Sequence, residues 1–307
     1  MDIRINGKTL DVNLDNENTL GDVLSGLEDW IAGSGHRISE LVIDEQFVKA
    51  SMIDEYFSRD IKSIKIIDIK TIAIAELMAA SLLNLIEDIN EYVCLNFEEK
   101  TKFFDKWKET PTAGFIFSDI PDLYAFCVNT FSSGSLAPNT LLTITEEIQR
   151  EINDPVKELT NIEQIINDIC ERLVDLPLDI QTGKDLRASQ TIQLFSAVTE
   201  KLFRIFRQFG IQGYLPLDEI NPNYGGKIPE KDKKPLYLLI TEFKDVLSDL
   251  LEAYEKNDSV LVGDITEYEA SVRLKELFSA ISNNIKNQSV LTEKLPAQNN
   301  NQTAGHT

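Results

Sequence analysis

Two clusters of acidic side chains have the residue types and the spacing that metal-dependent chemistry requires. The first cluster consists of Glu87, Asp88 and Glu91, and the second of Glu146, Glu147 and Glu151. Because residues three or four positions apart lie on one face of a helix, each cluster presents its carboxylates together. Carboxylate oxygens are ligands that Mg²⁺ prefers in proteins. If the two helices face each other, the sequence predicts a magnesium-dependent enzyme in which these carboxylates are the metal ligands.

The same clusters have a second interpretation as solvent-exposed helix surface, which the sequence favours. Both lie opposite apolar stripes, where solvent-facing residues are expected, and unpaired carboxylates are common on protein surfaces. Histidine is nearly absent, since the chain contains only His36 and His306. Zinc hydrolases and ferritin-like di-iron bundles require several histidines, so the composition excludes these classes. Beyond the carboxylate candidates, we assign no catalytic residue, no metal ligand and no cofactor.

A Gly183-Lys184 pair in the stretch DLPLDIQTGKDLRAS, 175–189, invites comparison with a phosphate-binding loop. Such a loop requires a second glycine five positions earlier and a serine or threonine after the lysine. Here no glycine stands at that position, and Asp185 follows the lysine. We therefore predict a turn between two helices. Pro177 would end the first helix, and Asp185 would begin the second, where a carboxylate suits the positive end of the helix dipole.

Aromatic side chains supply the first candidates for contact with a protein partner. The segment 97–131 is the most aromatic part of the chain, and its residues Phe103 and Trp107 alternate with lysines. Most of these rings are expected in the core, because aromatic residues dominate core burial. Aromatic rings beside long charged side chains are also common at protein interfaces, so Phe103 and Trp107 are partner-binding candidates.

A second group of partner-binding candidates consists of Asp264, Glu267 and Tyr268. They follow the short apolar run 260–262 and form an acidic edge beside an aromatic ring. The alternative is that this run is a buried connection that packs under neighbouring helices. The sequence does not separate the two alternatives.

The net charge restricts the class of partner. The chain contains 51 acidic and 30 basic residues, which gives a formal charge of −21. Because nucleic-acid affinity depends largely on basic groups, we expect no nucleic acid among the partners, but a protein with basic patches. No run of about 18 apolar residues and no charged-then-apolar leader occurs, so we expect no membrane contact and a cytoplasmic location. Heptad-like spacing at 78–92 and 195–209 would serve either intramolecular packing or a homo-oligomer.

The first 70 residues alternate between strand and helix signals. Asn6-Gly7 separates two alternating runs, which predicts a hairpin with a type I′ turn. Thr19 is expected to cap a helix whose apolar stripe includes Trp30, and glycines at 33 and 35 end that helix. Two further strands are expected at 38–43 and 61–70. This order of hairpin, helix and two strands resembles that of the β-grasp roll, the ubiquitin-like arrangement.

From residue 71 onward the apolar spacing becomes helical. Apolar side chains recur at intervals of three and four, as core-facing helices of a bundle require. The sequence therefore predicts an α+β protein with a β-grasp-like module at 1–70, a helical bundle at 71–285 and a disordered polar tail at 286–307. From this organisation and from the lack of a catalytic motif we predict a non-enzymatic interaction protein, acting as an adapter, scaffold or assembly chaperone. The magnesium-dependent enzyme is the alternative.

Overall fold

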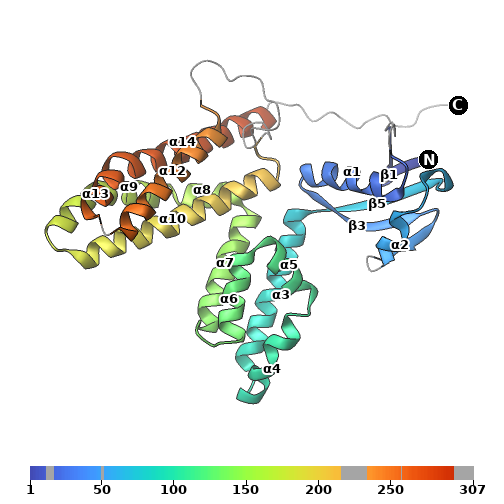
Figure 1. The fold of residues 1–307 in the computed structure, drawn as a ribbon, viewed down its shortest axis with the longest axis horizontal. Helices are drawn as coiled ribbons and strands as arrows, with labels where there is room; N and C mark the ends of the chain where they lie inside the picture. The colour runs from blue at the N-terminus through green and yellow to red at the C-terminus, as the bar shows by residue number, and fades with distance from the viewer. Residues whose placement is uncertain (12–16, 50–51, 216–233, 257, 294–307) are drawn as a thin grey trace. The chain divides into compact units, whose positions relative to one another are not determined.

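The computed structural model describes residues 1–11, 17–49, 52–215, 234–256 and 258–293 (Figure 1). The chain is an α+β protein, because a mixed five-stranded sheet in its N-terminal part precedes a mostly helical region. Two compact units are present. Unit 1 consists of residues 1–155 with 211–213, and unit 2 consists of the described residues of 156–210 and of 214 onward.

The sheet of unit 1 has the strand order β2-β1-β5-β3-β4. Its strands are β1 (Asp2–Ile5), β2 (Lys8–Leu10), β3 (His36–Ile43), β4 (Gln46–Val48) and β5 (Ile66–Ala73). β1 and β5 pair in parallel, and the other neighbours pair antiparallel. The predicted hairpin is confirmed, because Asn6 and Gly7 connect β1 to β2 with φ values of 51° and 76°. Positive φ at both positions is the requirement of a type I′ turn.

Helix α1 (Leu20–Gly33) shares an apolar core with the sheet. Thr19 caps it as predicted: its hydroxyl accepts from the backbone N–H of Asp22, whose carboxylate accepts from the backbone N–H of Thr19. The buried members of this core include Leu20, Leu24, Leu27 and Ile31 of α1 and Ile3, Ile67 and Ile69 of the sheet. Trp30 is 58% exposed, so the prediction that it belongs to the buried stripe of α1 was wrong. The residue lies at the margin of that stripe.

Four sequence-based expectations for the N-terminal part need correction. Strand β3 opens at His36, two residues before the expected strand 38–43, and β4 and the short helix α2 (Ile53–Phe57) were not predicted. The predicted strand 61–70 starts later, because Ile61–Ser63 form a 3₁₀ turn before β5. The carboxylate of Asp60 accepts from the backbone N–H of Lys62 and stabilises that turn.

Strand β5 leads directly into the helices of unit 1. These are α3 (Ile74–Cys94), α4 (Phe97–Trp107), α5 (Pro111–Asp119), α6 (Pro121–Phe131) and α7 (Pro138–Asn153). Met78, Leu82, Leu85 and Ile89 are buried along one face of α3, as the predicted stripe required. They share a core with Trp107 and with apolar side chains of α5, α6 and α7. The aromatic helix α4 is thus fixed against α3.

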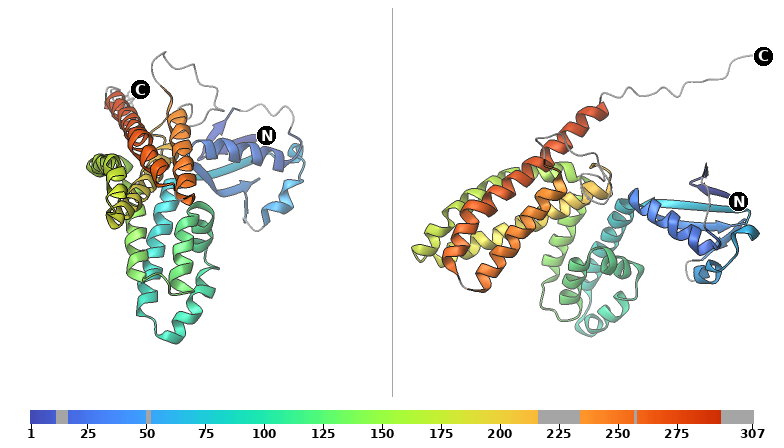
Figure 2. Two further views of the ribbon diagram at one scale, coloured as in Figure 1. Left: turned by 60° about the vertical axis from the view of Figure 1, so that its left-hand side comes forward. Right: turned by 45° about the horizontal axis from the view of Figure 1, so that its top comes forward.

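Unit 2 is a helical bundle whose long helices lie side by side (Figure 2). Its described elements are α8 (Pro155–Asn161), α9 (Glu163–Gln181), α10 (Asp185–Ile211), α12 (Leu236–Glu255), α13 (Ser259–Ile265), a π-helical turn η3 (Thr266–Ala270) and α14 (Ser271–Glu293). The predicted stripes of α9, α10 and α12 all contribute buried side chains to one core.

The predicted turn between α9 and α10 is confirmed, but Pro177 does not end the first helix. Helix α9 continues through Pro177 to Gln181, and Gly183, with φ of 69°, ends it. Proline in a helix interior removes one backbone hydrogen bond. Packing offsets that loss, since Leu176 is buried and the Pro177 ring lies against Gly263 of α13. A Cβ at position 263 would lie 3.2 Å from Pro177 Cβ, so glycine permits this approach.

The domain limits 1–70, 71–285 and 286–307 remain predictions. The predicted disordered tail starts within α14, which extends to Glu293. The rest of that tail, 294–307, lies outside the described residues.

Candidate binding groove

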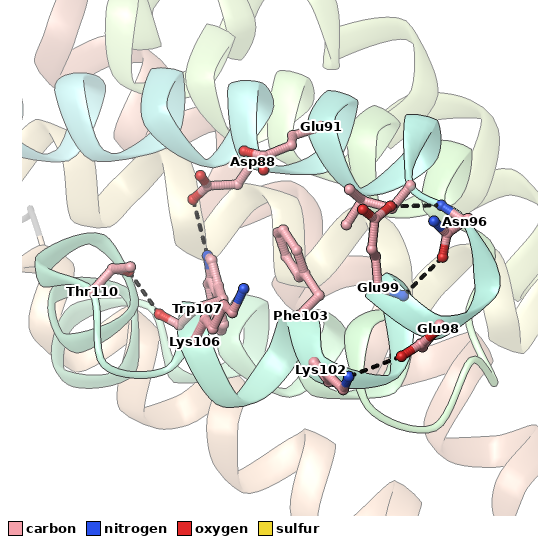
Figure 3. A pocket seen from close by; sticks show the side chains of 11 residues that line it. Asp88, Glu91, Asn96, Glu98, Glu99, Lys102, Phe103, Lys106, Trp107 and Thr110 are labelled. Atoms are coloured by element: carbon pink, nitrogen blue, oxygen red, sulfur yellow. Dashed lines mark hydrogen bonds and ion pairs between the residues drawn. The ribbon is translucent and has the colours of Figure 1, made fainter.

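A groove of about 630 Å³ lies between the C-terminal half of α3 and the helix α4 (Figure 3). Its lining consists of Asp88, Glu91, Leu95, Asn96, Glu98, Glu99, Lys102, Phe103, Lys106, Trp107 and Thr110. Small-molecule and side-chain binding pockets commonly fall in this range of volume. Two of the predicted metal ligands and both aromatic partner-binding candidates therefore meet in one groove.

The turn between α3 and α4 determines which side chains face each other. Asn96 caps α4: its side-chain oxygen accepts from the backbone N–H of Glu99 at 3.0 Å. The Glu99 carboxylate accepts in return from the backbone N–H of Asn96 at 3.1 Å. This reciprocal pair satisfies two backbone donors at the helix start. Because it fixes where α4 begins, it also places Phe103 and Trp107 opposite Asp88 (Figure 3).

An aromatic cluster holds α4 in position. Trp107 is 2% exposed, stacks on Tyr124 with ring centroids 5.7 Å apart, and meets Phe131 edge-on. Phe103 is half-buried and makes edge contacts with Tyr92 and Phe131. Burial makes Trp107 part of the core, whereas Phe103 keeps part of its ring in the groove. The partner-binding role predicted for Phe103 is therefore sterically available. Trp107 is buried and its indole N–H donates to Asp88, so it supports the groove from within the core.

Asp88 is the most perturbed group of the groove. Partial burial raises the pKa of its carboxyl group, a hydrogen bond from Trp107 Nε1 at 3.0 Å opposes that rise, and the like charges of Glu91 and Glu87 add to it. Carboxylates with perturbed pKa values in a cleft are candidates for a functional site. Within the described part of the chain, neither Asp88 nor Glu91 has a lysine or arginine at ion-pair distance.

The other charged residues of the groove have local roles. Lys102 forms an ion pair with Glu98 at 3.2 Å on the exposed face of α4, and Glu99 belongs to the helix cap. Lys106 lines the groove and is exposed. A positively charged ligand would thus meet Asp88 and Glu91, the two groove carboxylates that are neither in an ion pair nor part of a cap.

The two predicted carboxylate clusters do not line a common site. Glu87 is exposed on α3, while Glu147 and Glu151 belong to α7 and are absent from the groove lining. Glu151 is buried, and both residues of α7 have interaction partners. Among the described residues, no three histidine, cysteine or acidic side chains are grouped as a metal site requires. The magnesium hypothesis stays a prediction.

The second group of partner-binding candidates lies in unit 2, on helical structure. Asp264 belongs to α13, and Glu267 and Tyr268 belong to the π-helical turn η3. The apolar run before them is helical as well: Val262 is buried, whereas Val260 and Leu261 are exposed. The interpretation of this run as a buried connection is therefore wrong for its first two residues, because their side chains lie on the solvent side of α13.

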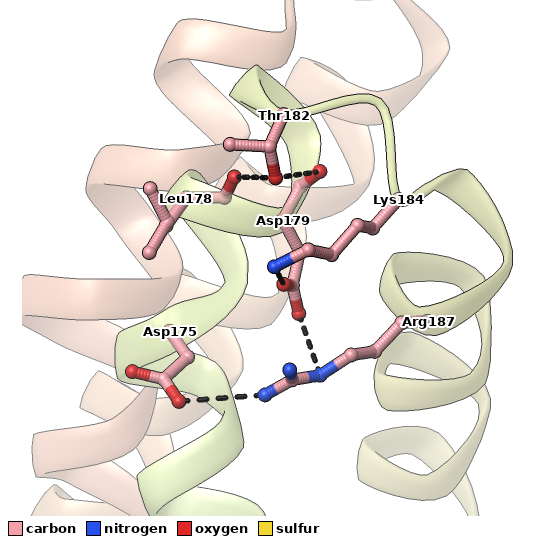
Figure 4. A network of polar contacts seen from close by, with 6 residues as sticks. All are labelled: Asp175, Leu178, Asp179, Thr182, Lys184 and Arg187. Carbon is pink, nitrogen blue, oxygen red and sulfur yellow. Dashed lines mark hydrogen bonds and ion pairs between the residues drawn. The ribbon is translucent and has the colours of Figure 1, made fainter.

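Gly183-Lys184 lies in a network of ion pairs that stabilises the turn between α9 and α10 (Figure 4). The buried carboxylate of Asp179 lies 3.4 Å from Lys184 Nζ and 2.9 Å from Arg187 Nε. The contact with Arg187 is an ion pair without the alignment of a hydrogen bond. Arg187 also reaches Asp175 at 3.5 Å. The lysine that suggested phosphate binding therefore neutralises a carboxylate of its own chain.

Sequence reasoning missed the contributions of Asn96 and Glu99 to the groove. The signal was present, because Asn followed by Glu three positions later is a capping box. The capping box predicts that α4 begins after Asn96. The turn before Asn96 brings α4 back along α3.

Comparisons with known proteins match two parts of the chain. Residues 1–73 match a family described as the TP0873 N-terminal domain, and residues 157–280 match a domain of unknown function, DUF8042. The first match ends where β5 ends, and the second falls in unit 2 except for residues 211–213. The residues that line the groove lie, in the sequence, between these two matched segments. Neither family match therefore includes the groove.

A curated relative is the DNA-directed RNA polymerase subunit alpha of Fusobacterium nucleatum subsp. nucleatum. It is 26% identical over 144 residues, which cover 47% of this chain and 43% of that protein. The matched segment is thus less than half of that relative's length. No solved structure matches this chain. In the described residues, every helix is too short or too polar to cross a bilayer.

Proposed function

We propose that this protein is a non-enzymatic interaction protein that binds a basic, extended segment of a protein partner in the groove between α3 and α4. The observation that carries this proposal is the pair Asp88 and Glu91, two groove carboxylates with no described lysine or arginine at ion-pair distance. A lysine or arginine side chain would supply the missing cation, and the exposed part of the Phe103 ring would contact its aliphatic part.

The charge of the whole chain supports a basic partner. A net charge of −21 creates a negative potential that attracts basic segments and increases their association rates at low ionic strength. Adapter, scaffold and assembly chaperone all fit this chemistry, and the cytoplasm is the location that we propose.

A β-grasp assignment for the N-terminal part belongs to the same proposal. Its support is the parallel pair β1 and β5 at the centre of the sheet, with a hairpin on each side and α1 sharing the core with the sheet. Modules of this type often serve as recognition platforms, which is an argument from fold analogy.

Peptide titration tests the groove. A fluorescein-labelled decapeptide rich in lysine, arginine and phenylalanine is titrated with the full chain, beside a control peptide in which glutamate replaces the basic residues. We expect Glu91→Lys to weaken binding of the basic peptide at least tenfold. The control variant Glu255→Lys makes the same charge change at an exposed position of α12 and should alter it less than twofold. Equal effects of both variants, or an affinity that does not fall as salt rises, would contradict the proposal.

A further inference from the structure

The π-helical turn η3 aligns two rows of side chains in unit 2. The buried row is Val262, Thr266, Ala270 and Leu274, and the exposed row is Val260, Asp264, Tyr268 and Val272. Both rows advance by four residues at each step. In an α-helix, residues four positions apart lie about 40° apart around the helix axis. The first and last residues of a four-residue row would therefore lie about 120° apart. A π-helical turn contains one residue more than an α-helical turn. Because one residue corresponds to about 100° of rotation, this turn reduces the angle between the ends of each row by about 100°.

The sequence contains the residues that stabilise this wide turn. Hydroxyl Oγ1 of Thr266 donates to the backbone carbonyls of both Val262 and Gly263 at 2.9 Å. These hydrogen bonds supply a donor to the two carbonyl groups at the point where the α-helix α13 changes into the π-helical turn. Gly263 lies against Pro177, so α13 is held to α9 on its buried side. The exposed row therefore faces away from the bundle core.

The exposed row is apolar at three of its four positions. Val260 is 71% exposed, Tyr268 is 65% exposed and Val272 is 46% exposed. Together with Leu261 they form a solvent-facing stripe along α13, η3 and the start of α14. From Val260 to Val272 this stripe is about 18 Å long, which corresponds to three turns of a helix. Exposed apolar stripes of this kind are typical of interaction sites.

The charge along the stripe has one sign. Residues 258–272 contain four acidic side chains, Asp258, Asp264, Glu267 and Glu269, and no lysine or arginine. The nearest arginine in sequence, Arg273, is engaged with Glu276 at 2.7 Å and Glu242 at 3.3 Å. Arg273 also attracts Glu269, and Glu267 accepts a hydrogen bond from the hydroxyl of Tyr268. The stripe thus combines apolar contact area with a border whose acidic residues outnumber its basic ones.

We propose that this stripe is a docking surface for an amphipathic helix of a partner protein. The apolar side of that helix packs against Val260, Tyr268 and Val272, and its lysines or arginines face Asp264 and Glu267. A helix satisfies its backbone hydrogen bonds internally, so it needs only the apolar contact and the charge complement that the stripe offers. This surface lies in unit 2 and is separate from the groove, so the two sites are tested independently.

A designed helical peptide tests the proposal. The probe is an 18-residue amphipathic peptide with a leucine stripe bordered by lysines, and its control has the same composition in a scrambled order. We expect the full chain to bind the amphipathic peptide at least tenfold more tightly than the scrambled one. The double variant Tyr268→Ala with Val272→Ala should lose that preference. Tyr254→Ala removes another exposed tyrosine of unit 2 that lies off the stripe, and should keep it.

A charge exchange makes the test specific. Asp264→Lys should weaken binding of the lysine peptide, and a peptide with glutamate in place of lysine should bind this variant better than it binds the unmodified chain. Glu28→Lys makes the same charge change at an exposed position of α1, outside both the stripe and the groove, and should leave binding of the amphipathic peptide unchanged. Equal affinity of all variants for the amphipathic peptide would overturn the proposal. Sedimentation of the unmodified chain as a dimer, and of the double variant Tyr268→Ala with Val272→Ala as a monomer, would also overturn the proposal. The occupant of the stripe would then be a second copy of this chain.

Discussion

Asp88 and Asp179 are both carboxylates that helices withdraw from water, but their surroundings differ. Asp179 is buried and lies against two cations, Lys184 and Arg187. Asp88 is half-buried, its hydrogen-bond donor is the neutral indole of Trp107, and its charged neighbours on the helix are acidic. A carboxylate that the fold neutralises supports the structure, whereas one without a cation retains the capacity to bind one. Asp179 thus contributes to stability through its cations, whereas no described cation lies at ion-pair distance from Asp88.

The largest effect is expected from Trp107→Ala, which removes the ring between the groove and the core. Trp107 is buried against Tyr124 and Phe131, so its truncation should destabilise the protein by about 3–5 kcal/mol. Urea denaturation followed by circular dichroism measures this change. Trp107→Phe keeps most of the volume and should be milder. A loss below 1 kcal/mol for Trp107→Ala would show that the aromatic cluster does not hold α4.

Arg187→Ala should have the next largest effect, because it removes one of the two cations beside the buried Asp179. We expect a destabilisation of about 1–2 kcal/mol, since Lys184 stays in place and Arg187 itself is half exposed. The matched control is Arg172→Ala, which removes an exposed arginine of α9. If both variants have the same denaturation midpoint, Asp179 is not stabilised by the ion pair.

Asp88→Asn should change the free energy of unfolding in the opposite direction, by stabilising the protein. The pKa of Asp88 is raised in the folded state, so its ionised form opposes folding at neutral pH. This destabilisation begins to shrink as pH falls through the folded-state pKa and is gone below the unfolded-state pKa. We expect the variant to be slightly more stable than the unmodified chain at pH 7, with a difference that shrinks on acidification. Thermal unfolding across pH 4–8 measures it. If the variant is instead less stable than the unmodified chain at pH 7, the carboxylate of Asp88 stabilises the fold, as that of Asp179 does.

Lys102→Ala should have the smallest effect. Its ion pair with Glu98 is exposed, and such pairs contribute about 0.5 kcal/mol or less. The same urea experiment should show a midpoint close to that of the unmodified chain. The variant does free Glu98, so binding of the basic decapeptide should be retained or slightly strengthened. Weaker binding would indicate that Lys102 itself contacts the partner.

Sequence reasoning predicted best the features that neighbouring residues determine. The turn at Asn6-Gly7 and the cap at Thr19 depend on a few consecutive positions, and both are present. Strand β4 was missed because three residues are too few for a periodic signal. The course of α9 through Pro177 depends on contact with Gly263, far away in sequence.

The groove could be predicted only in part for the same reason. Apolar spacing predicted α3, and the acidic cluster on that helix was recognised. The contact between Asp88 and Trp107 joins residues 19 positions apart, and it depends on the length of the turn between the helices. Periodicity fixes the face of each helix, but it does not fix which faces meet.

The parallel pairing of β1 with β5 determines how the N-terminal part would respond to mechanical force. β1 begins at the N-terminus, and β5 continues without a linker into α3. A pull between the N-terminus and α3 would draw the two strands past each other along their length. The ladder from Asp2 beside Ile66 to Ile5 beside Ile69 would then carry the load in shear, with its hydrogen bonds sharing the force. Antiparallel β1 and β2, pulled apart from their open ends, would instead separate one bond at a time.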